Sequence, residues 1–171
     1  MSQRSLTVSW EDPSVATRQG ARLSGLDYLQ AMIAGRIPRT PMACLMGFEL
    51  TEAREGFAVF QCRPGERHYN PIGVVHGGLA CTLLDSAMGC SVYTTLAAAV
   101  GYTTLELKVN LVRALTSDTG LMRCEGRILH RGSRTATAEG KLLDQAGKLC
   151  AHATSTCIIF PAPAGNIARG N

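Results

Sequence analysis

Apolar residues recur at helical spacing over one long segment, from Gly77 to about Thr95. At about 100° per residue they occupy a wide arc of the helix surface: Leu79, Leu83, Leu84, Ala87, Met88 and Cys90. The narrower remainder of that surface holds Thr82, Asp85, Ser86, Gly89 and Tyr93. Because such an apolar surface is unfavourable in water, the pattern predicts a helix that is covered on most of its sides.

The segment after this helix has the alternation of a β-strand. Within Thr104–Arg113, apolar residues alternate with Thr104, Glu106, Lys108 and Asn110. The apolar positions are Leu105, Leu107, Val109 and Leu111. This clean period of two predicts a strand with one buried face.

Five further strands are expected from shorter patterns. Residues 48–62 contain two of them around a turn, and three more lie at about 120–130, 134–144 and 148–160. Their connections contain glycine and short polar residues that suit hairpins. The predicted order is therefore two strands, the buried helix and an antiparallel meander of four strands. This is an α+β layer architecture, in which one central helix packs against one curved sheet.

Small residues on one expected strand indicate how closely the long helix can approach the sheet. Ala136, Ala138 and Gly140 alternate along this strand and so share one face. A face without large side chains lets a helix approach closely.

The N-terminal region predicts short helices. From Ser24 to Ala34 apolar residues recur at helical spacing, with Ser24 as the expected N-cap and Gly35 as the stop. A second apolar piece runs from Met42 to Met46. The expected organisation is a flexible N-terminus (1–21), one domain (22–160, with a helical extension at 22–47 and a core at 48–160) and a flexible tail (161–171).

Composition narrows the class of protein. A chain of 171 residues suits one domain. Its net charge of +4 is too mild for a nucleic-acid partner, and its low charged fraction of 18% favours self-association. No stretch approaches the roughly 20 apolar residues of a membrane span, so no membrane is expected. The N-terminus lacks the apolar core of a signal peptide.

The cysteines indicate the compartment. There are seven, an odd number without a Cys-x-x-Cys pair, so neither a disulfide framework nor a zinc site is expected. Free thiols inside apolar segments suit a reducing cytoplasm. The four histidines show no metal-ligand spacing, and we expect no metal and no bound cofactor.

Arginines recur on the later strands, at Arg123, Arg127, Arg131 and Arg134. Two interpretations remain open on charge alone. The arginines bind phosphates of a small anionic ligand, or they form a solvated strand face.

The start of the long helix carries the candidate chemistry. Gly77 and Gly78 allow a ligand to approach bare backbone, where the first N–H groups of a helix are unpaired and the helix dipole is positive. A substrate carbonyl oxygen that accepts a hydrogen bond from the Gly77 N–H would be stabilised as it becomes an oxyanion. Asp85 lies about two turns further along, and a carboxylate in an apolar helix needs a hydrogen bond or a function. Together these groups suit acyl transfer to water.

Other interpretations of the same residues stay open. The glycine pair also fits a tight turn, and Asp85 also fits a hydrogen-bonded structural role. His76 either caps the loop or acts as a base. The chain contains no Gly-x-Ser-x-Gly elbow, phosphate loop or dinucleotide fingerprint, so the hydrolase and nucleotide classes that depend on them are not supported.

Several spaced motifs resemble the hotdog thioesterases of the phenylacetyl-CoA (PaaI-like) type. The segment from Asn70 to Gly78 has the form Asn-x-x-Gly-x-x-His-Gly-Gly, and Leu83-Leu84-Asp85 supplies the following Leu-x-Asp. Similar motifs occur at 103–107, 110–113, 130–134 and 144–147, so the resemblance spans about residues 42–160. It implies the hotdog fold, one long central helix wrapped by a curved antiparallel β-sheet. The extension at 22–47 also resembles one branch of the family.

The resemblance assigns roles position by position. Gly77 would polarise the thioester carbonyl with its N–H, and Asn70 would assist from the preceding loop. Asp85 would activate water as general base or, alternatively, act as nucleophile. Thr104 would help to place the water, with Thr103 as the neighbouring alternative. Substrate contacts are expected at His76, Gly78, Thr103, Arg131, Ser133 and Arg134, with the last three near the CoA nucleotide.

The implied activity is hydrolysis of an acyl-CoA to a free acid and CoA. The family's site forms where two subunits meet, which implies a homodimer and a dimer of dimers. Two alternatives remain: a hotdog hydratase or dehydratase acting on acyl-CoA, and a non-catalytic acyl-CoA binding protein.

Overall fold

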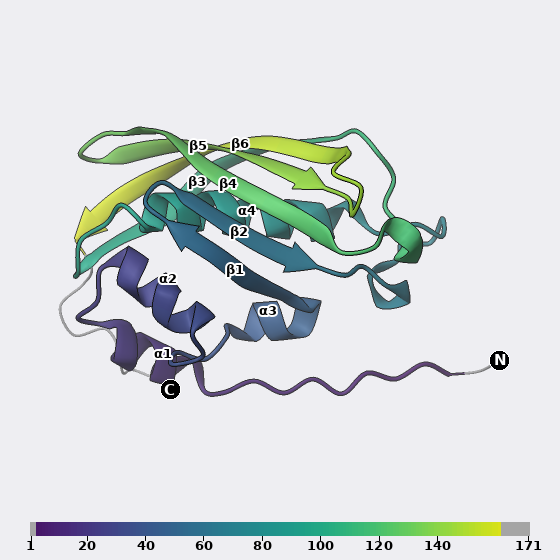
Figure 1. Cartoon of the computed structure of the whole chain (residues 1–171), viewed down its shortest axis with the longest axis horizontal. Coiled ribbons are helices and arrows are strands. Elements are labelled where there is room, and N and C mark those ends of the chain that lie inside the picture. Colours follow the sequence, from purple (N-terminus) through teal and green to yellow (C-terminus); the bar gives the residue numbers. More distant parts are fainter. Residues whose placement is uncertain (1–2, 162–171) are drawn as a thin grey trace.

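A single curved sheet wraps one long helix, α4 (Gly77–Tyr93), in the computed structural model, which describes residues 3–161. Figure 1 shows α4 between the sheet and the N-terminal helices. The six strands are β1 (Phe48–Arg54), β2 (Phe57–Cys62), β3 (Val100–Leu111), β4 (Met122–Arg131), β5 (Thr135–Leu143) and β6 (Leu149–Pro161). All neighbouring strands are antiparallel. The α+β architecture is confirmed.

The strand order corrects one prediction. The sheet runs β1-β2-β4-β5-β6-β3, so β3 pairs with β6 and does not begin a meander of four strands. After β3 the chain crosses to the other half of the sheet through the short 3-10 helix η2 (Ser117–Thr119), and β4 then pairs with β2. Pairing with two strands buries β4 in the middle of the sheet. As a result β1 and β3 form the two sheet edges.

The apolar arc of α4 lies against the sheet. Leu83, Leu84, Ala87 and Met88 are fully buried. The small face predicted on β5 is confirmed, since Ala136 and Ala138 are also fully buried. These residues form the central part of one core that reaches from β1 to β6.

The closest approach of helix and sheet is at Gly126 on β4. A Cβ atom at this position would overlap the backbone carbonyl of Ala87. Interiors are packed too densely for such an overlap to be absorbed without moving the helix. Gly126 therefore sets the distance between α4 and the strand beneath it.

Three N-terminal helices cover the side of α4 that the sheet leaves open (Figure 1). They are α1 (Pro13–Gly20), α2 (Gly25–Ile33) and α3 (Pro41–Met46). The predicted N-cap is confirmed, because the Ser24 hydroxyl accepts the Asp27 N–H at 3.2 Å. Helix α3 ends at Gly47, which has a left-handed conformation with φ of 70°.

Helix α1 was not predicted, because residues 13–20 show no clear apolar period. The available signal was Asp12-Pro13, an N-cap residue followed by a proline at the first helical position. The Asp12 carboxylate accepts the Ser14 N–H at 2.9 Å. Flexibility of residues 1–21 and of the tail stays a prediction, and 162–171 lie outside the described residues.

Among residues 3–161, no helix has the length and apolar character that crossing a membrane requires.

Gly126→Ala is expected to destabilise the protein by about 1–3 kcal/mol, the usual cost of overpacking a core. Urea unfolding measures this change. Gly65→Ala is the matched control, because a Cβ there would meet only the end of the Arg67 side chain, at 3.6 Å. Equal unfolding free energies for the two variants would contradict the close approach at Gly126.

Candidate active site

Asp85 and Thr104 meet across the gap between α4 and β3. The Thr104 hydroxyl donates a hydrogen bond of 2.9 Å to Oδ1 of Asp85. Asp85 is half-buried on α4, beside the edge strand β3. Its second carboxylate oxygen has no side-chain or backbone donor within the described part of the chain. The pair therefore presents an oriented carboxylate with an acceptor free for water or substrate.

A β-bulge brings Thr104 to this position. The pairing register of β3 and β6 shifts between Thr104 and Glu106, leaving Leu105 as the extra residue. The strict alternation in the sequence predicts that Thr104 and Leu107 point to opposite faces. With one residue bulged out, both lie on the face toward the helix, and Leu105 is 60% exposed. Thr103 is exposed, so Thr104 is the hydroxyl that meets Asp85.

The Asp85–Thr104 pair lies in the wall of a cavity of about 630 Å³. Its volume is within the range of small-molecule sites, roughly 300–1,000 Å³. One wall comes from α4 and β3, and the other comes from the N-terminal helices and β1. The apolar and aromatic lining residues include Tyr28, Leu29, Met32, Phe48, Leu50, Phe60, Tyr93 and Tyr102. The aromatic part of this lining left no signal in the sequence, because isolated tyrosines do not disturb a helical or strand period.

The thiol and phenol groups of this cavity are neutral near pH 7. Burial raises the pKa of Cys90 to about 12. Burial also raises the pKa of Tyr102 well above its ordinary value. The carboxylates in the lining are Asp85 and Glu49, and Glu49 lies exposed on the edge strand β1. Asp85 is thus the ionisable group best placed to accept a proton inside the cavity.

His76 caps α4 and leaves the Gly77 N–H open. Nδ1 of His76 accepts the Gly78 N–H at 2.8 Å, as the capping interpretation predicts. Gly77 follows as the first helical residue, and its N–H bonds to no group in residues 3–161. An unpaired N–H at the positive end of a helix is suited to an oxyanion.

Asn70 lies beside Gly77, in a second cavity of about 320 Å³. Oδ1 of Asn70 accepts the backbone N–H of Ile72 at 3.0 Å and of Val74 at 3.4 Å. These bonds hold the loop and orient the side chain. The Nδ2 group of Asn70 bonds to no described residue, and it can donate to a ligand oxygen.

The two halves of the predicted site are far apart within one chain. Gly77 and Asp85 are eight residues apart on α4, which corresponds to roughly 12 Å at 1.5 Å per residue. Gly77 and Asn70 line one cavity, whereas Asp85 and Thr104 line the other. A single carbonyl group cannot contact both.

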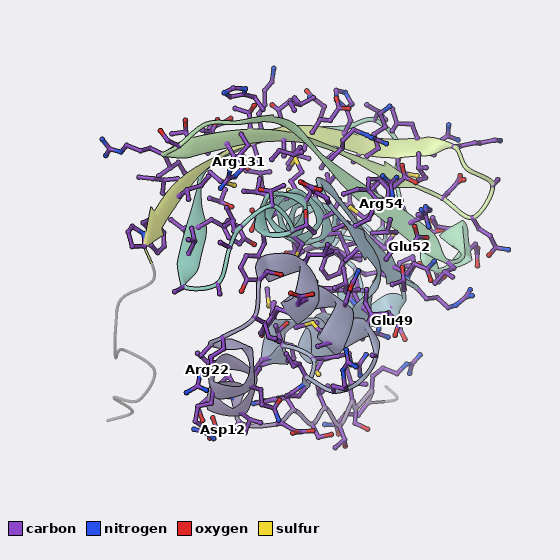
Figure 2. The ribbon with its side chains drawn as sticks, turned by 60° about the vertical axis from the view of Figure 1, so that its left-hand side comes forward. Asp12, Arg22, Glu49, Glu52, Arg54 and Arg131 are labelled. Atoms are coloured by element: carbon purple, nitrogen blue, oxygen red, sulfur yellow. The ribbon has the colours of Figure 1, made fainter. Side chains whose placement is uncertain are left out.

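Arg131, Ser133 and Arg134 line a third cavity, of about 550 Å³, together with Val100 and Phe160. Figure 2 shows Arg131 on the sheet side of the molecule, away from Asp12 and Arg22, which lie on either side of α1. All three polar residues are exposed. Their position between strand ends suits an anionic ligand that lies on the surface.

The other two arginines of the series are engaged in structural contacts. Arg123 forms ion pairs of 2.7 Å with both Glu52 and Glu125. Arg127 lies over the ring of Phe57 at 5.3 Å from its centre. Arg123 and Arg127 therefore belong to a strand face with structural contacts. Arg131 and Arg134 are the arginines that can still bind the phosphates of a ligand.

His76, Gly78 and Thr103 line none of these three cavities, and their substrate contacts stay predictions. No group of three His, Cys, Asp or Glu side chains within residues 3–161 is arranged to hold a metal ion. All seven cysteines are free thiols.

Comparison with known proteins identifies the family. Residues 72–151 match the model of the thioesterase superfamily. A solved structure, the conserved protein PA5202 of Pseudomonas aeruginosa, is 30% identical, covers 71% of this chain and 95% of its own, and superposes with a TM-score of 0.66. The chain belongs to the thioesterase superfamily.

Two further relatives of this thioesterase narrow the family. A putative thioesterase of Ralstonia eutropha, related to phenylacetic acid degradation, is 29% identical over 77% of this chain and 98% of its own, with a TM-score of 0.69. A 1,4-dihydroxy-2-naphthoyl-CoA hydrolase of Listeria monocytogenes is 26% identical over 104 residues, which are 61% of this chain and 83% of its own. The hotdog fold and the PaaI-like resemblance are confirmed, and the protein is a thioester hydrolase.

His68 gives the loop that carries Asn70 a pH-dependent stability. Its Nδ1 accepts the Gly65 N–H at 3.1 Å, so Nε2 carries the proton and donates to the Met46 carbonyl at 3.0 Å. Burial and the nearby Arg67 lower the pKa of His68. The folded state thus favours the neutral ring.

Because the folded pKa is lower than the unfolded value of 6.5, this stabilisation is complete above that value. It is lost as the pH falls through the folded pKa. Urea unfolding between about pH 8 and pH 5 is expected to show a smaller acid loss of stability in His68→Gln than in the wild type. His130→Gln, at an exposed position, is the control and is expected to follow the wild type. Identical pH dependence in all three proteins would exclude this role of His68.

Proposed function

We propose that this thioesterase hydrolyses an acyl-CoA to a free acid and CoA, with Asp85 as the general base. The observation that carries the proposal is the Asp85–Thr104 hydrogen bond in the wall of an apolar cavity. The name of the Listeria relative, a CoA hydrolase that acts on an aromatic acyl group, supports the substrate class.

The reaction needs a base and an oxyanion donor. Asp85 takes a proton from water as the water oxygen attacks the thioester carbonyl, and Thr104 keeps the carboxylate in position. The Gly77 N–H, assisted by Asn70, stabilises the negative oxygen that forms. The carbon–sulfur bond then breaks, and the CoA thiolate leaves with a proton returned from Asp85. A thiolate is a good leaving group, so no strong general acid is required.

Each reacting centre is proposed to combine two subunits. Asp85 and Thr104 of one subunit face the Gly77 and Asn70 groups of the other, which accounts for their separation of roughly 12 Å within one chain. The long edge strand β3 is the proposed contact, because its outward-facing row of hydrogen-bonding groups has no partner strand in the described chain. Leu105, Leu111 and Val112 are each more than half exposed beside this edge. A homodimer with a continuous sheet would cover them, and a dimer of dimers is the proposed larger assembly.

The CoA nucleotide is proposed to lie against Arg131, Ser133 and Arg134. Guanidinium groups bind phosphate with paired, charge-assisted hydrogen bonds, and these two arginines are exposed beside an open cavity. His76, Gly78 and Thr103 are proposed to contact the ligand near the reacting carbonyl.

Asp85→Asn is expected to lower kcat by about 100- to 10,000-fold, the usual contribution of a general base. CoA release, followed with a thiol reagent across aryl-acyl and straight-chain acyl-CoAs, measures the change. Thr104→Val removes the hydroxyl and is expected to lower kcat less, because Asp85 remains. Thr154→Val is the control for Thr104, because Thr154 lies exposed on β6 and lines none of the three cavities. A folded Asp85→Asn variant with full activity would refute the assignment of the base.

Mixing two inactive variants tests whether the site is shared. Gly77→Pro removes the N–H at a helix position that tolerates proline, and Asp85→Asn removes the base. If one site uses Asp85 and Gly77 from different subunits, a mixed dimer contains one intact site. After subunit exchange of equal amounts, about one quarter of the wild-type activity is expected, since half of the dimers are mixed. No recovery, with exchange verified by light scattering and mass spectrometry, would place both groups of a site in one chain.

A further inference from the structure

Three tyrosines close one end of the cavity beside Asp85. Tyr28 comes from α2, Tyr93 from the last turn of α4 and Tyr102 from β3. The ring centres of Tyr28 and Tyr93 are 5.7 Å apart in an edge-on arrangement. Those of Tyr93 and Tyr102 are 5.6 Å apart. We call these three residues the tyrosine row.

Helix α2, which supplies Tyr28, is fixed against the end of α4. The backbone N–H of Gly25 donates to the Leu96 carbonyl at 2.9 Å. A Cβ on Gly25 would overlap the carbonyl of Tyr93, so only glycine allows this contact. Leu29 is 2% exposed and anchors the next turn of the helix in the main core. Tyr28 is thus held on a rigid wall and not on a mobile lid.

One wall of the cavity follows α4, from Asp85, the proposed base, to Tyr93 of the tyrosine row. Asp85, Ser86, Cys90 and Tyr93 follow one another on the side of the helix that lines it. Asp85 and Tyr93 are eight residues apart, roughly 12 Å along the axis. A thioester carbonyl beside Asp85 would therefore direct its acyl group along α4 toward Tyr28.

The Tyr28 ring lies between the cavity and the end of α1. A Cβ on Gly20, at the end of α1, would overlap the Tyr28 ring. The ring therefore fills the gap between α1 and the end of α4. Removing it would extend the cavity in the direction of the acyl group, whereas the groups around Asp85 would be unchanged.

The lining between the two ends is apolar, and burial keeps its tyrosines neutral. The pKa of Tyr28 is raised by burial, with smaller contributions from Tyr93 and Cys90. Apart from Asp85, the charged lining residues are Arg39 and Glu49, and both are exposed. An uncharged, apolar acyl group suits this interior.

We propose that Tyr28 is a specificity-determining residue that sets the upper length of the acyl group. This inference rests on the proposed function, since it takes Asp85 as the reacting end of the cavity. The ring of Tyr28 ends the cavity, so acyl chains that extend past the tyrosine row are excluded. The N-terminal extension thereby belongs to the substrate site.

The experiment compares kcat/KM over straight-chain acyl-CoAs from butanoyl to hexadecanoyl, with CoA release as the readout. Tyr28→Ala is expected to move the optimum to longer chains, with a gain of up to about fourfold for each additional buried methylene group. Tyr28→Leu opens less space and is expected to produce a smaller shift in the same direction. It also preserves the test if the alanine variant fails to fold. Tyr28→Phe, which keeps the ring, and Gln30→Ala, on the exposed side of α2, are expected to keep the wild-type profile.

The possible outcomes separate this inference from the proposed function. A wild type that releases CoA, with an unchanged chain-length profile in the folded Tyr28→Ala and Tyr28→Leu variants, would overturn the role of Tyr28 and leave the proposed function intact. A wild type that releases no CoA from any thioester would overturn the proposed function and the inference with it. A profile that shifts equally in Gln30→Ala would show a general effect of α2 and would also overturn the role of Tyr28.

Discussion

The burial of α4 is the constraint on which the rest of the structure depends. A helix with so wide an apolar arc has to be covered on most sides, and the sheet curves around it to do so. Beside the edge strand β3, however, the helix and the sheet leave Asp85 in the wall of a cavity. A carboxylate next to a core is tolerated only with a hydrogen-bond partner, and Thr104 provides one at 2.9 Å. Core packing and site geometry therefore have the same origin.

The β-bulge at Leu105 shows how small a change links the sheet to the site. Without the extra residue, the strand that buries Leu107 would turn Thr104 away from the helix. One register shift resolves this conflict and exposes Leu105 at the sheet edge. Leu105 is thus the residue whose insertion orients Thr104, and it is also part of the apolar edge that we propose as the subunit contact.

Most elements were predictable because their signals are local. The period of α4 and the Ser24 cap depend on neighbours in sequence, and both are confirmed. The strand order was not predictable in the same way. Alternation shows that β3 is a strand, but its partner is chosen by the crossover that carries β4 to β2. The meander of four strands was wrong for this reason.

The site was predictable to a similar degree. Asp85 and the glycine pair stand out because each conflicts with an ordinary helix, and their separation follows from helix geometry. The contact of Asp85 with Thr104 depends on a bulge in β3 that the alternation does not show. The tyrosine row left no signal, since its members come from three separate elements and meet only after folding. A site residue that breaks the pattern of its helix or strand can be recognised in the sequence, whereas a site residue that fits the pattern cannot.

Helix α2 is attached to the end of α4 through Gly25, whereas other residues of α2 line the cavity. Attachment depends on a backbone hydrogen bond and on a missing Cβ, together with the buried Leu29. The side chains at 28, 32 and 33 face the cavity and bear less of that attachment. Substitutions there can reshape the cavity while the helix stays in place and the groups around Asp85 stay unchanged. In the proposed site, the extension therefore shapes the cavity, whereas α4 and β3 hold the reacting groups.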